Sequence, residues 1–307
     1  MERILPAQGG MEQDGFTLVR SRRQKGRQKK AQLARSASSS IVVGGEEKEK
    51  ETEKYNAFHA DGKTWRHRLQ QMELLFSSWN MAEIAWSGMD ALKETFKEGE
   101  CMILGIGSFS SSRDALLQVA LIRLVINAFA CPKISVFDPI LEEEEIEWCQ
   151  MEGWNTIKED KNGSYHCSLP LIAYLPHCSK LLTARFIAQQ LIDYYEIYID
   201  RICDDSIAHD SSPPPPFSLC LICNGFARMA HPDVWDNTPS ISDFFATLQP
   251  HIIQSPLSSL LSSSRSFTFS AFADICVHHV VGLEEAGACS LSWESLIPVC
   301  RNMLVDA

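Results

Sequence analysis

The sequence predicts an α/β fold, a Rossmann-like three-layer sandwich in which a mostly parallel sheet lies between two layers of helices. Three observations predict it. Short apolar runs alternate with long helical patterns, a glycine turn follows the first apolar run, and polar or glycine residues follow the later ones. Strands that alternate with helices need crossover connections, which are right-handed and cover both faces of a parallel sheet.

The chain is long enough to bury a substantial core. It has 307 residues, of which 45% are hydrophobic and 22% are charged, which suffices for one large α/β domain or two small ones. We divide it into a disordered tail over residues 1–60, a helical lead-in over 61–99, the Rossmann-like domain over 100–285 and a C-terminal extension over 286–307.

The tail is basic and the rest of the chain is acidic. Residues 1–45 carry nine Lys or Arg against three Asp or Glu, whereas the whole chain has a net charge of −11. The tail holds too few apolar residues to offset its ordering entropy. Its run Arg20–Lys30 fits a nuclear-import signal or a contact with an acidic surface. Because the body is acidic and the run has no interleaved aromatics, specific nucleic-acid binding is not expected.

Neither membrane insertion nor export is expected. No apolar run approaches the roughly 20 residues that span a bilayer, and the N-terminus has no apolar signal-peptide core. The eleven cysteines are an odd number and lie mostly within apolar runs. Without an export signal, we expect them to be reduced and buried in a cytoplasmic or nuclear protein.

The expected strands are short apolar runs that end at turn residues such as Gly, Asn, Asp and Pro. They are Cys101–Leu104, Lys133–Phe137, Trp154–Ile157, Leu171–Leu175, Phe217–Ile222 and a last β region between Phe267 and Val281.

The expected helices have apolar residues at helical spacing, and several have recognisable ends. They are Thr64–Lys97 in two pieces broken near Ser77–Asn80, Ser112–Phe129, Leu141–Glu152, Leu181–Ile202 and a helix from Pro239 to about Gln249. The helix at Ser112 is apolar on nearly all sides and is therefore deeply packed. Gly153 suits a C-cap, and Pro239 suits the first helical position.

Four predicted strands end in polar or glycine clusters. In an open parallel sheet, ligands bind in the crevice outside the carboxyl ends of the strands. A glycine turn before a helix also lets backbone N–H groups approach an anion. We therefore expect a ligand-binding site built from residues at these strand ends: Gly105, Gly107, Ser108, Asp138, His177 and Asn224.

Each of these features also has a structural interpretation. Ser110 stands where the dinucleotide fingerprint has its third glycine, and Asp138 follows Gly105 by 33 residues, whereas the ribose-binding acid is expected about 20 residues on. The turn therefore either binds an anion or only caps the next helix. Asp138 either accepts hydrogen bonds from a ribose-like diol or caps the helix that follows. The glutamates over 142–145 are expected to form a solvated first turn.

The cysteine and histidine patterns favour neither a nucleophile–base pair nor a metal site, and they leave the reactivity of Cys178 open. His177 and Cys178 are adjacent, so they point in opposite directions and cannot form a nucleophile–base pair. At a helix N-terminus, Cys178 is expected to have a lowered thiol pKa. Cys220 and Cys223 have metal-ligand spacing but face opposite sides of a strand. His278 and His279 alternate in the same way, either as surface residues of an edge strand or with one ring at the crevice.

Five motifs in order resemble those of the sensitivity-to-red-light-reduced family and cover about residues 100–281. They are Gly105–Ser111 with Gln118; Val136–Pro139 with Glu145, Glu147 and Gly153; Tyr174–Cys178 with Leu182; Leu221–Phe226; and Phe272–Asp274 followed by His278. The tail segment Phe16–Arg20 also appears in members. The chain departs from the family in the prolines 213–216, in Gly225 where a serine is common, and in the serine-rich loop 258–266.

The resemblance implies a Rossmann-like domain with a regulatory role. For plant members it implies phytochrome-mediated red-light signalling and circadian clock function, and for fungal and animal members regulation of haem biosynthesis. It brings no established reaction, so we expect a regulatory protein rather than an enzyme, with regulatory proteins as alternative partners. No cofactor is assigned.

Three hypotheses follow for the strand ends. In the first, they bind a small anionic or nucleotide-like ligand: Gly105, Gly107 and Ser108 hold the anion, Asp138 takes a hydroxyl pair, and His177 and Asn224 line the far side. In the second, the chain is an S-adenosylmethionine-dependent transferase, which shares the order strand, GxG turn, helix, strand, acid. In the third, it is a scaffold whose strand-end motifs are structural caps.

Overall fold

The computed structural model describes residues 64–78, 95–203, 217–230, 239–256, 275–280 and 293–305. The expected tail, residues 79–94 of the second helical piece and the serine-rich loop lie outside these residues.

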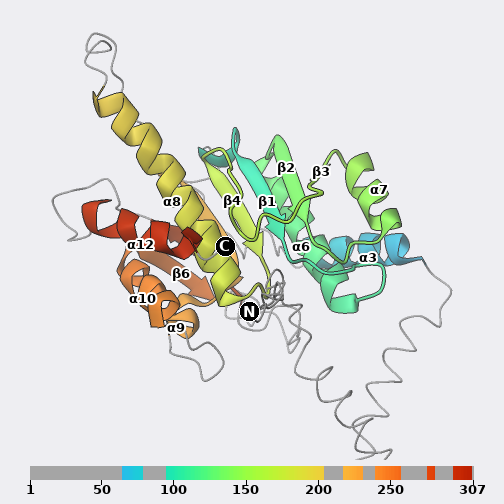
Figure 1. The fold of residues 1–307 in the computed structure, drawn as a ribbon. Coiled ribbons are helices and arrows are strands. Elements are labelled where there is room, and N and C mark those ends of the chain that lie inside the picture. The colour runs from blue at the N-terminus through green and yellow to red at the C-terminus, as the bar shows by residue number, and fades with distance from the viewer. Residues whose placement is uncertain are drawn as a thin grey trace, which may run out of the picture.

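A seven-stranded sheet forms the centre of the molecule, in the order β3-β2-β1-β4-β5-β7-β6 (Figure 1). The strands are β1 (Glu100–Leu104), β2 (Lys133–Phe137), β3 (Asn155–Thr156), β4 (Leu171–Leu175), β5 (Leu219–Asn224), β6 (Ile252–Pro256) and β7 (Ile275–Val280). Strands β1 to β5 pair in parallel, and β7 is antiparallel to both of its neighbours. The prediction of a mostly parallel sheet is therefore confirmed.

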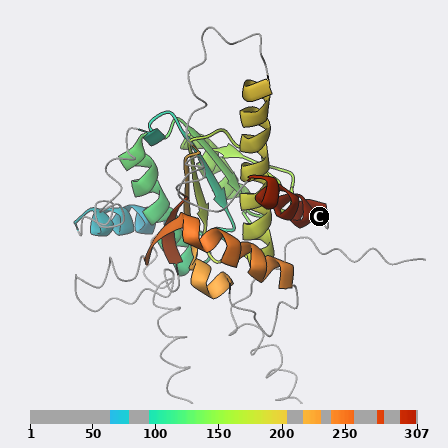
Figure 2. The same ribbon diagram turned by 90° about the vertical axis from the view of Figure 1, so that its left-hand side faces the viewer.

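Helices cover both faces of the sheet, as the two views show (Figures 1 and 2). They are α3 (Trp65–Ser78), α6 (Arg113–Phe129), α7 (Glu143–Met151), α8 (Lys180–Cys203), α9 (Phe226–Met229), α10 (Pro239–Leu248), the short 3₁₀-helix η2 (Gln249–His251) and α12 (Trp293–Val305). Buried side chains of α3, α6 and α7 form one core with the sheet, and those of α8, α10 and α12 form the other.

Alternation along each strand divides its side chains between the two cores. In β1, Cys101 and Ile103 face the core under α6, whereas Met102 and Leu104 face the core under α8. Every residue of β1 and β4 is buried, as expected for parallel strands that are covered on both faces. This explains why these strands appear in the sequence as continuous apolar runs.

The lead-in helix α3 belongs to the first core and supports the turn after β1. Trp65 makes edge-to-face contacts with Phe109 and Trp148, at centroid distances of 5.2 and 5.7 Å. Its indole Nε1 donates to Glu144 of α7. Arg123 of α6 binds Glu73 of α3 on the same side of the sheet. Since Phe109 lies in the turn after β1, α3 fixes the base of that turn.

The C-terminal third of the sheet differs from the prediction. Strand β6 was not predicted, because its apolar residues Ile252 and Ile253 are adjacent rather than alternating and prolines flank them. The last β region was predicted between Phe267 and Val281; its described part is β7, an interior strand between β5 and β6. Helix α12 was not predicted either, and it contains Pro298.

None of the described helices is long and apolar enough to cross a membrane.

Candidate functional site

The chain makes a tight turn where β1 ends, and this turn requires glycine. Gly105 and Gly107 have φ angles of +68° and +81°, a region that side chains with a Cβ rarely adopt. A Cβ on Gly105 would lie 2.7 Å from Cys178 Sγ, closer than any ordinary contact. The turn then runs to Ser112, whose side chain caps α6 by accepting a hydrogen bond from the Ala115 amide at 3.3 Å.

Asp138 joins the turn to the end of β2. Its Oδ2 accepts a hydrogen bond from the Gly107 amide at 2.7 Å, and its Oδ1 accepts one from the Ile140 amide at 2.9 Å. Burial raises the pKa of Asp138, the two amide hydrogen bonds lower it, and the nearby charge of Glu145 raises it further. The carboxylate therefore keeps a conformation that both bridges two strands and stabilises the corner after β2.

Glu145 fills the other side of the same turn. Its Oε1 accepts hydrogen bonds from the Ser110 amide at 2.5 Å and from Ser108 Oγ at 3.0 Å. Its Oε2 accepts one from the Glu142 amide at 2.7 Å, which completes a capping box at the start of α7. The expectation that all four glutamates are solvated is wrong for Glu145, which has no exposed surface.

Sequence reasoning missed this role of Glu145, because the capping-box signature has Ser or Thr at the N-cap and this chain has Glu142 there. The structure also changes the interpretation of Ser108. Its hydroxyl bonds to Glu145 and to Ser111, the latter at 2.6 Å, so it serves the internal structure of the turn.

Cys178 and His177 follow the end of β4. The thiol of Cys178 donates to the Leu104 carbonyl at 3.4 Å and is buried against the glycine turn. Burial raises the pKa of Cys178, and the charge of Asp138 raises it further. The expected low pKa is therefore wrong, because desolvation disfavours the thiolate here. His177 is partly exposed and has a φ angle of +57°, which is uncommon outside glycine.

Asn224 ends β5 and completes the row of strand ends. Its side-chain Nδ2 donates to the Cys178 carbonyl at 3.2 Å, and its own carbonyl lies 3.1 Å from Nε2 of His278. His278 is fully buried on the interior strand β7, with its ring 4.4 Å from that of Phe226. Burial lowers the pKa of His278 to about 4. The edge-strand interpretation of this histidine is therefore wrong, and the neutral ring supports Asn224 from below.

Together these contacts link the carboxyl ends of four strands. Gly107 contacts Asp138, Gly105 packs against Cys178, and Cys178 bonds to Asn224. We call this set the strand-end site: Gly105, Gly107, Asp138, His177, Cys178 and Asn224. Of the predicted residues, only Ser108 is turned away from it, toward Glu145.

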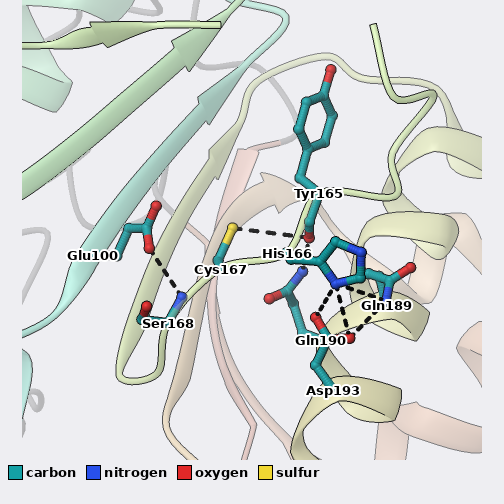
Figure 3. A network of polar contacts seen from close by, with 8 residues as sticks. All are labelled: Glu100, Tyr165, His166, Cys167, Ser168, Gln189, Gln190 and Asp193. Carbon is teal, nitrogen blue, oxygen red and sulfur yellow. Dashed lines mark hydrogen bonds and ion pairs between the residues drawn. The ribbon is translucent and has the colours of Figure 1, made fainter. Parts of the chain in front are cut away.

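The opposite, amino edge of the sheet carries a different polar network (Figure 3). Glu100, at the start of β1, accepts from the Ser168 amide at 3.0 Å and from Lys133 Nζ at 2.8 Å. On the loop before β4, His166 Nδ1 lies 2.9 Å from Asp193 of α8. Gln189 Nε2 also donates to Asp193 at 2.7 Å. These contacts connect the loop before β4 to β1 and to α8. No pattern in the sequence predicted them.

The two cysteines of β5 lie in different cores of the molecule. Cys220 packs in the core under α6 and Cys223 in the core under α8, so the two thiols point to opposite faces as predicted. Within the described residues, no three or more His, Cys, Asp or Glu side chains gather as a metal site.

A family model, the SRR1 domain, matches residues 66–279. The chain belongs to the SRR1 family. The match spans all residues of the strand-end site and agrees with the family resemblance seen in the sequence motifs. This SRR1 domain is also 24% identical over 124 residues to an SRR1-like protein of Mus musculus, covering 38% of this chain. The aligned part spans about half of that relative, 50% of its length. No solved structure matches the chain.

Proposed function

We propose that this SRR1 domain is a regulatory protein that binds a small nucleotide-like ligand at the strand-end site. The observation that supports the proposal best is the contact chain between four strand ends, from Gly107 through Asp138 and from Cys178 to Asn224. Ligands of open α/β sheets bind at this edge, where the order of the strands reverses. Here the reversal lies between β1 and β4, next to the glycine turn.

The residues of the site suit different parts of such a ligand. The two glycines let a ligand approach the backbone closely, because no Cβ stands in the way. Asp138 uses two of its roughly four lone-pair positions on amides and is partly exposed, so it can accept hydrogen bonds from a pair of hydroxyls. His177 and Asn224 stand at the ends of β4 and β5 and would line the other side.

The biological role that we propose is the regulatory one implied by the family resemblance. In a plant setting this is red-light signalling through phytochrome and the circadian clock, and in other settings it is regulation of haem biosynthesis. Such roles suit a cytoplasmic or nuclear protein, and the basic run Arg20–Lys30 suits nuclear import. Regulatory proteins would then bind the domain in its ligand-bound state.

A thermal-shift screen with nucleosides, nucleotides, S-adenosylmethionine and haem precursors tests the proposal. A ligand at 100 times its dissociation constant should raise the free energy of unfolding by about 2.7 kcal/mol. Asp138→Ala should abolish the shift, whereas Asp193→Ala, at the amino edge, should keep it. Absence of a shift with every compound, or equal loss in both variants, contradicts the proposal.

The strand order favours a second candidate, an S-adenosylmethionine-dependent transferase. The order differs from the dinucleotide-binding order 3-2-1-4-5-6 by the antiparallel strand β7 between β5 and β6. By fold-level analogy alone, those transferases share the succession of strand, GxG turn, helix, strand and acid, which here runs from β1 through α6 and β2 to Asp138. Release of S-adenosylhomocysteine from S-adenosylmethionine by the purified chain with cell extract as acceptor would support this candidate. Binding without turnover would support the regulatory one.

A further inference from the structure

We infer that the strand-end site takes a nucleoside-type ligand, with free hydroxyl groups and without phosphate. This inference rests on the proposed function and narrows its ligand class. The glycine turn alone suggested an anion, but the hydrogen bonds of the turn point to a ligand of different charge.

Two amides of the glycine turn, which could otherwise hold a phosphate, already have carboxylate partners. In dinucleotide-binding folds, the glycine turn and the following helix N-terminus direct their N–H groups at the pyrophosphate. Here the Gly107 amide donates to Asp138 at 2.7 Å, and the Ser110 amide donates to Glu145 at 2.5 Å. The chain supplies its own anions on both sides of the turn.

Within the described residues, no cation forms an ion pair with either of these two carboxylates. The ion pairs within the described residues involve other acidic groups, and neither Asp138 nor Glu145 pairs with a described Lys or Arg. A phosphate on the Gly107 amide would therefore stand beside the Asp138 carboxylate. Like charges at such a distance repel strongly, more so when they are partly shielded from water.

Asp138 keeps hydrogen-bonding capacity for groups that donate. Glu145 is fully buried and its two oxygens already accept three hydrogen bonds. Asp138 is partly exposed and accepts only from two amides. A carboxylate with free lone pairs attracts hydroxyl donors and cations. A ribose diol supplies hydroxyl donors, and a nucleoside with a positive group supplies a cation as well.

Isothermal titration of the full chain with adenosine, S-adenosylmethionine, AMP, ATP and inorganic phosphate tests the inference. Adenosine or S-adenosylmethionine should bind about tenfold or more tightly than AMP and ATP, since one repulsive contact at about 4 Å near a protein surface, where water screens it less than in bulk, exceeds this effect. Inorganic phosphate should not bind. If AMP or ATP binds as tightly as adenosine, the inference fails and the proposed function stands. If none of the five binds, both fail.

A charge-removing variant locates the cause of the preference. In Asp138→Asn, adenosine should bind more weakly and its advantage over AMP should disappear. The matched control is Glu147→Gln, which removes one negative charge from an exposed position of α7 and should leave the ratio of the two affinities unchanged. A ratio that is the same in Asp138→Asn and in the native chain overturns the assignment of the preference to Asp138. The comparison of ligands on the native chain needs neither variant to fold.

Discussion

The two edges of the sheet differ in the partners of their buried and partly buried carboxylates. At the amino edge, Glu100 accepts a hydrogen bond from the ammonium group of Lys133, and Asp193 lies against His166. At the carboxyl edge, Asp138 and Glu145 accept only from backbone amides and a hydroxyl. No Lys or Arg in the part of the chain that the structure describes pairs with either of them, and burial raises the pKa of Asp138.

This difference indicates which edge serves stability and which serves binding. Charge pairs at the amino edge connect the starts of β1 and β2 with the loop before β4, as a structural network does. Uncompensated, partly buried acids reduce stability and are typical of functional sites. The same contrast orders the following predictions.

The largest expected effect is at the glycine turn of the carboxyl edge. Gly105→Ala should lower the free energy of unfolding by about 3 kcal/mol, because a left-handed backbone costs about 1–2 kcal/mol and overpacking against Cys178 adds to it. Gly153→Ala is the matched control: Gly153 has a φ of +78° but no atom within 4 Å of its Cβ position. It should cost only about 1 kcal/mol. Equal losses, measured by urea denaturation, would contradict the packing of the turn against Cys178.

The buried histidine beneath the carboxyl edge should make stability depend on pH. The pKa of His278 is lowered from 6.5 to about 4 by burial, so the unfolded chain takes up a proton that the folded chain does not. Stability is therefore lost as the pH falls from 6.5 to 4, by about 3 kcal/mol from this group.

In His278→Gln this part of the pH dependence should disappear, because the amide can still donate to Asn224 without titrating. The control His67→Gln changes an exposed histidine of α3 and should retain the native profile. Denaturation curves between pH 4 and 7 give the comparison, and an unchanged slope in His278→Gln would refute the buried, neutral state of the ring.

A smaller effect is expected at the amino edge. Lys133→Gln removes the cation beside Glu100, whose side chain is only 3% exposed, and leaves that carboxylate with the Ser168 amide. The free energy of unfolding should fall by about 2 kcal/mol, since a buried acid loses its charged partner. Lys158→Gln, at an exposed position in the loop after β3, should change it by less than about 0.5 kcal/mol. Equal effects of the two substitutions would remove the distinction between the edges.

The smallest effect has the opposite sign. Because burial raises the pKa of Asp138 above its ordinary value of 3.8, the ionised form is disfavoured in the folded chain, and its contribution to stability falls as the pH rises above 3.8. The free energy of unfolding of Asp138→Asn, relative to that of the native chain, should therefore be more favourable at pH 7 than at pH 3.5. Urea denaturation at the two pH values measures this. If the free energy of unfolding of Asp138→Asn falls relative to that of the native chain as the pH rises, Asp138 is a stabilising ion like Glu100.

The sequence predicts the parallel half of the fold well and the antiparallel edge poorly. Continuous apolar runs bounded by turn residues identify β1, β2 and β4 at or within one residue of their observed bounds. Burial of these strands on both faces gives the sequence a strong local signal. Strand β6 lacks that signal: Ile253 is 60% exposed, and the strand depends on pairing with β7. Strand β7 is interior only because β6 pairs with its outer side. No local sequence pattern predicts this pairing.

For the strand-end site, the sequence predicts where the residues lie but not their pKa values or their burial. Parallel strand ends meet at one edge, so Gly105, Asp138 and Asn224 could be grouped from order alone. The pKa of Cys178 and the burial of Glu145 depend on what packs around them. A helix N-terminus predicts a low thiol pKa, but enclosure against Leu104 and the turn reverses its direction.

The most direct test of the account is an amide NMR titration of the ¹⁵N-labelled chain with adenosine. If adenosine binds at the strand ends, the NMR resonances of the Gly107 and Ile140 amides, which donate to Asp138, should shift. The amide of Ser168, which donates to Glu100 at the amino edge, should not move. Shifts at Ser168 without shifts at Gly107 and Ile140, or no shift at either edge at millimolar adenosine, would contradict a binding site at the strand ends.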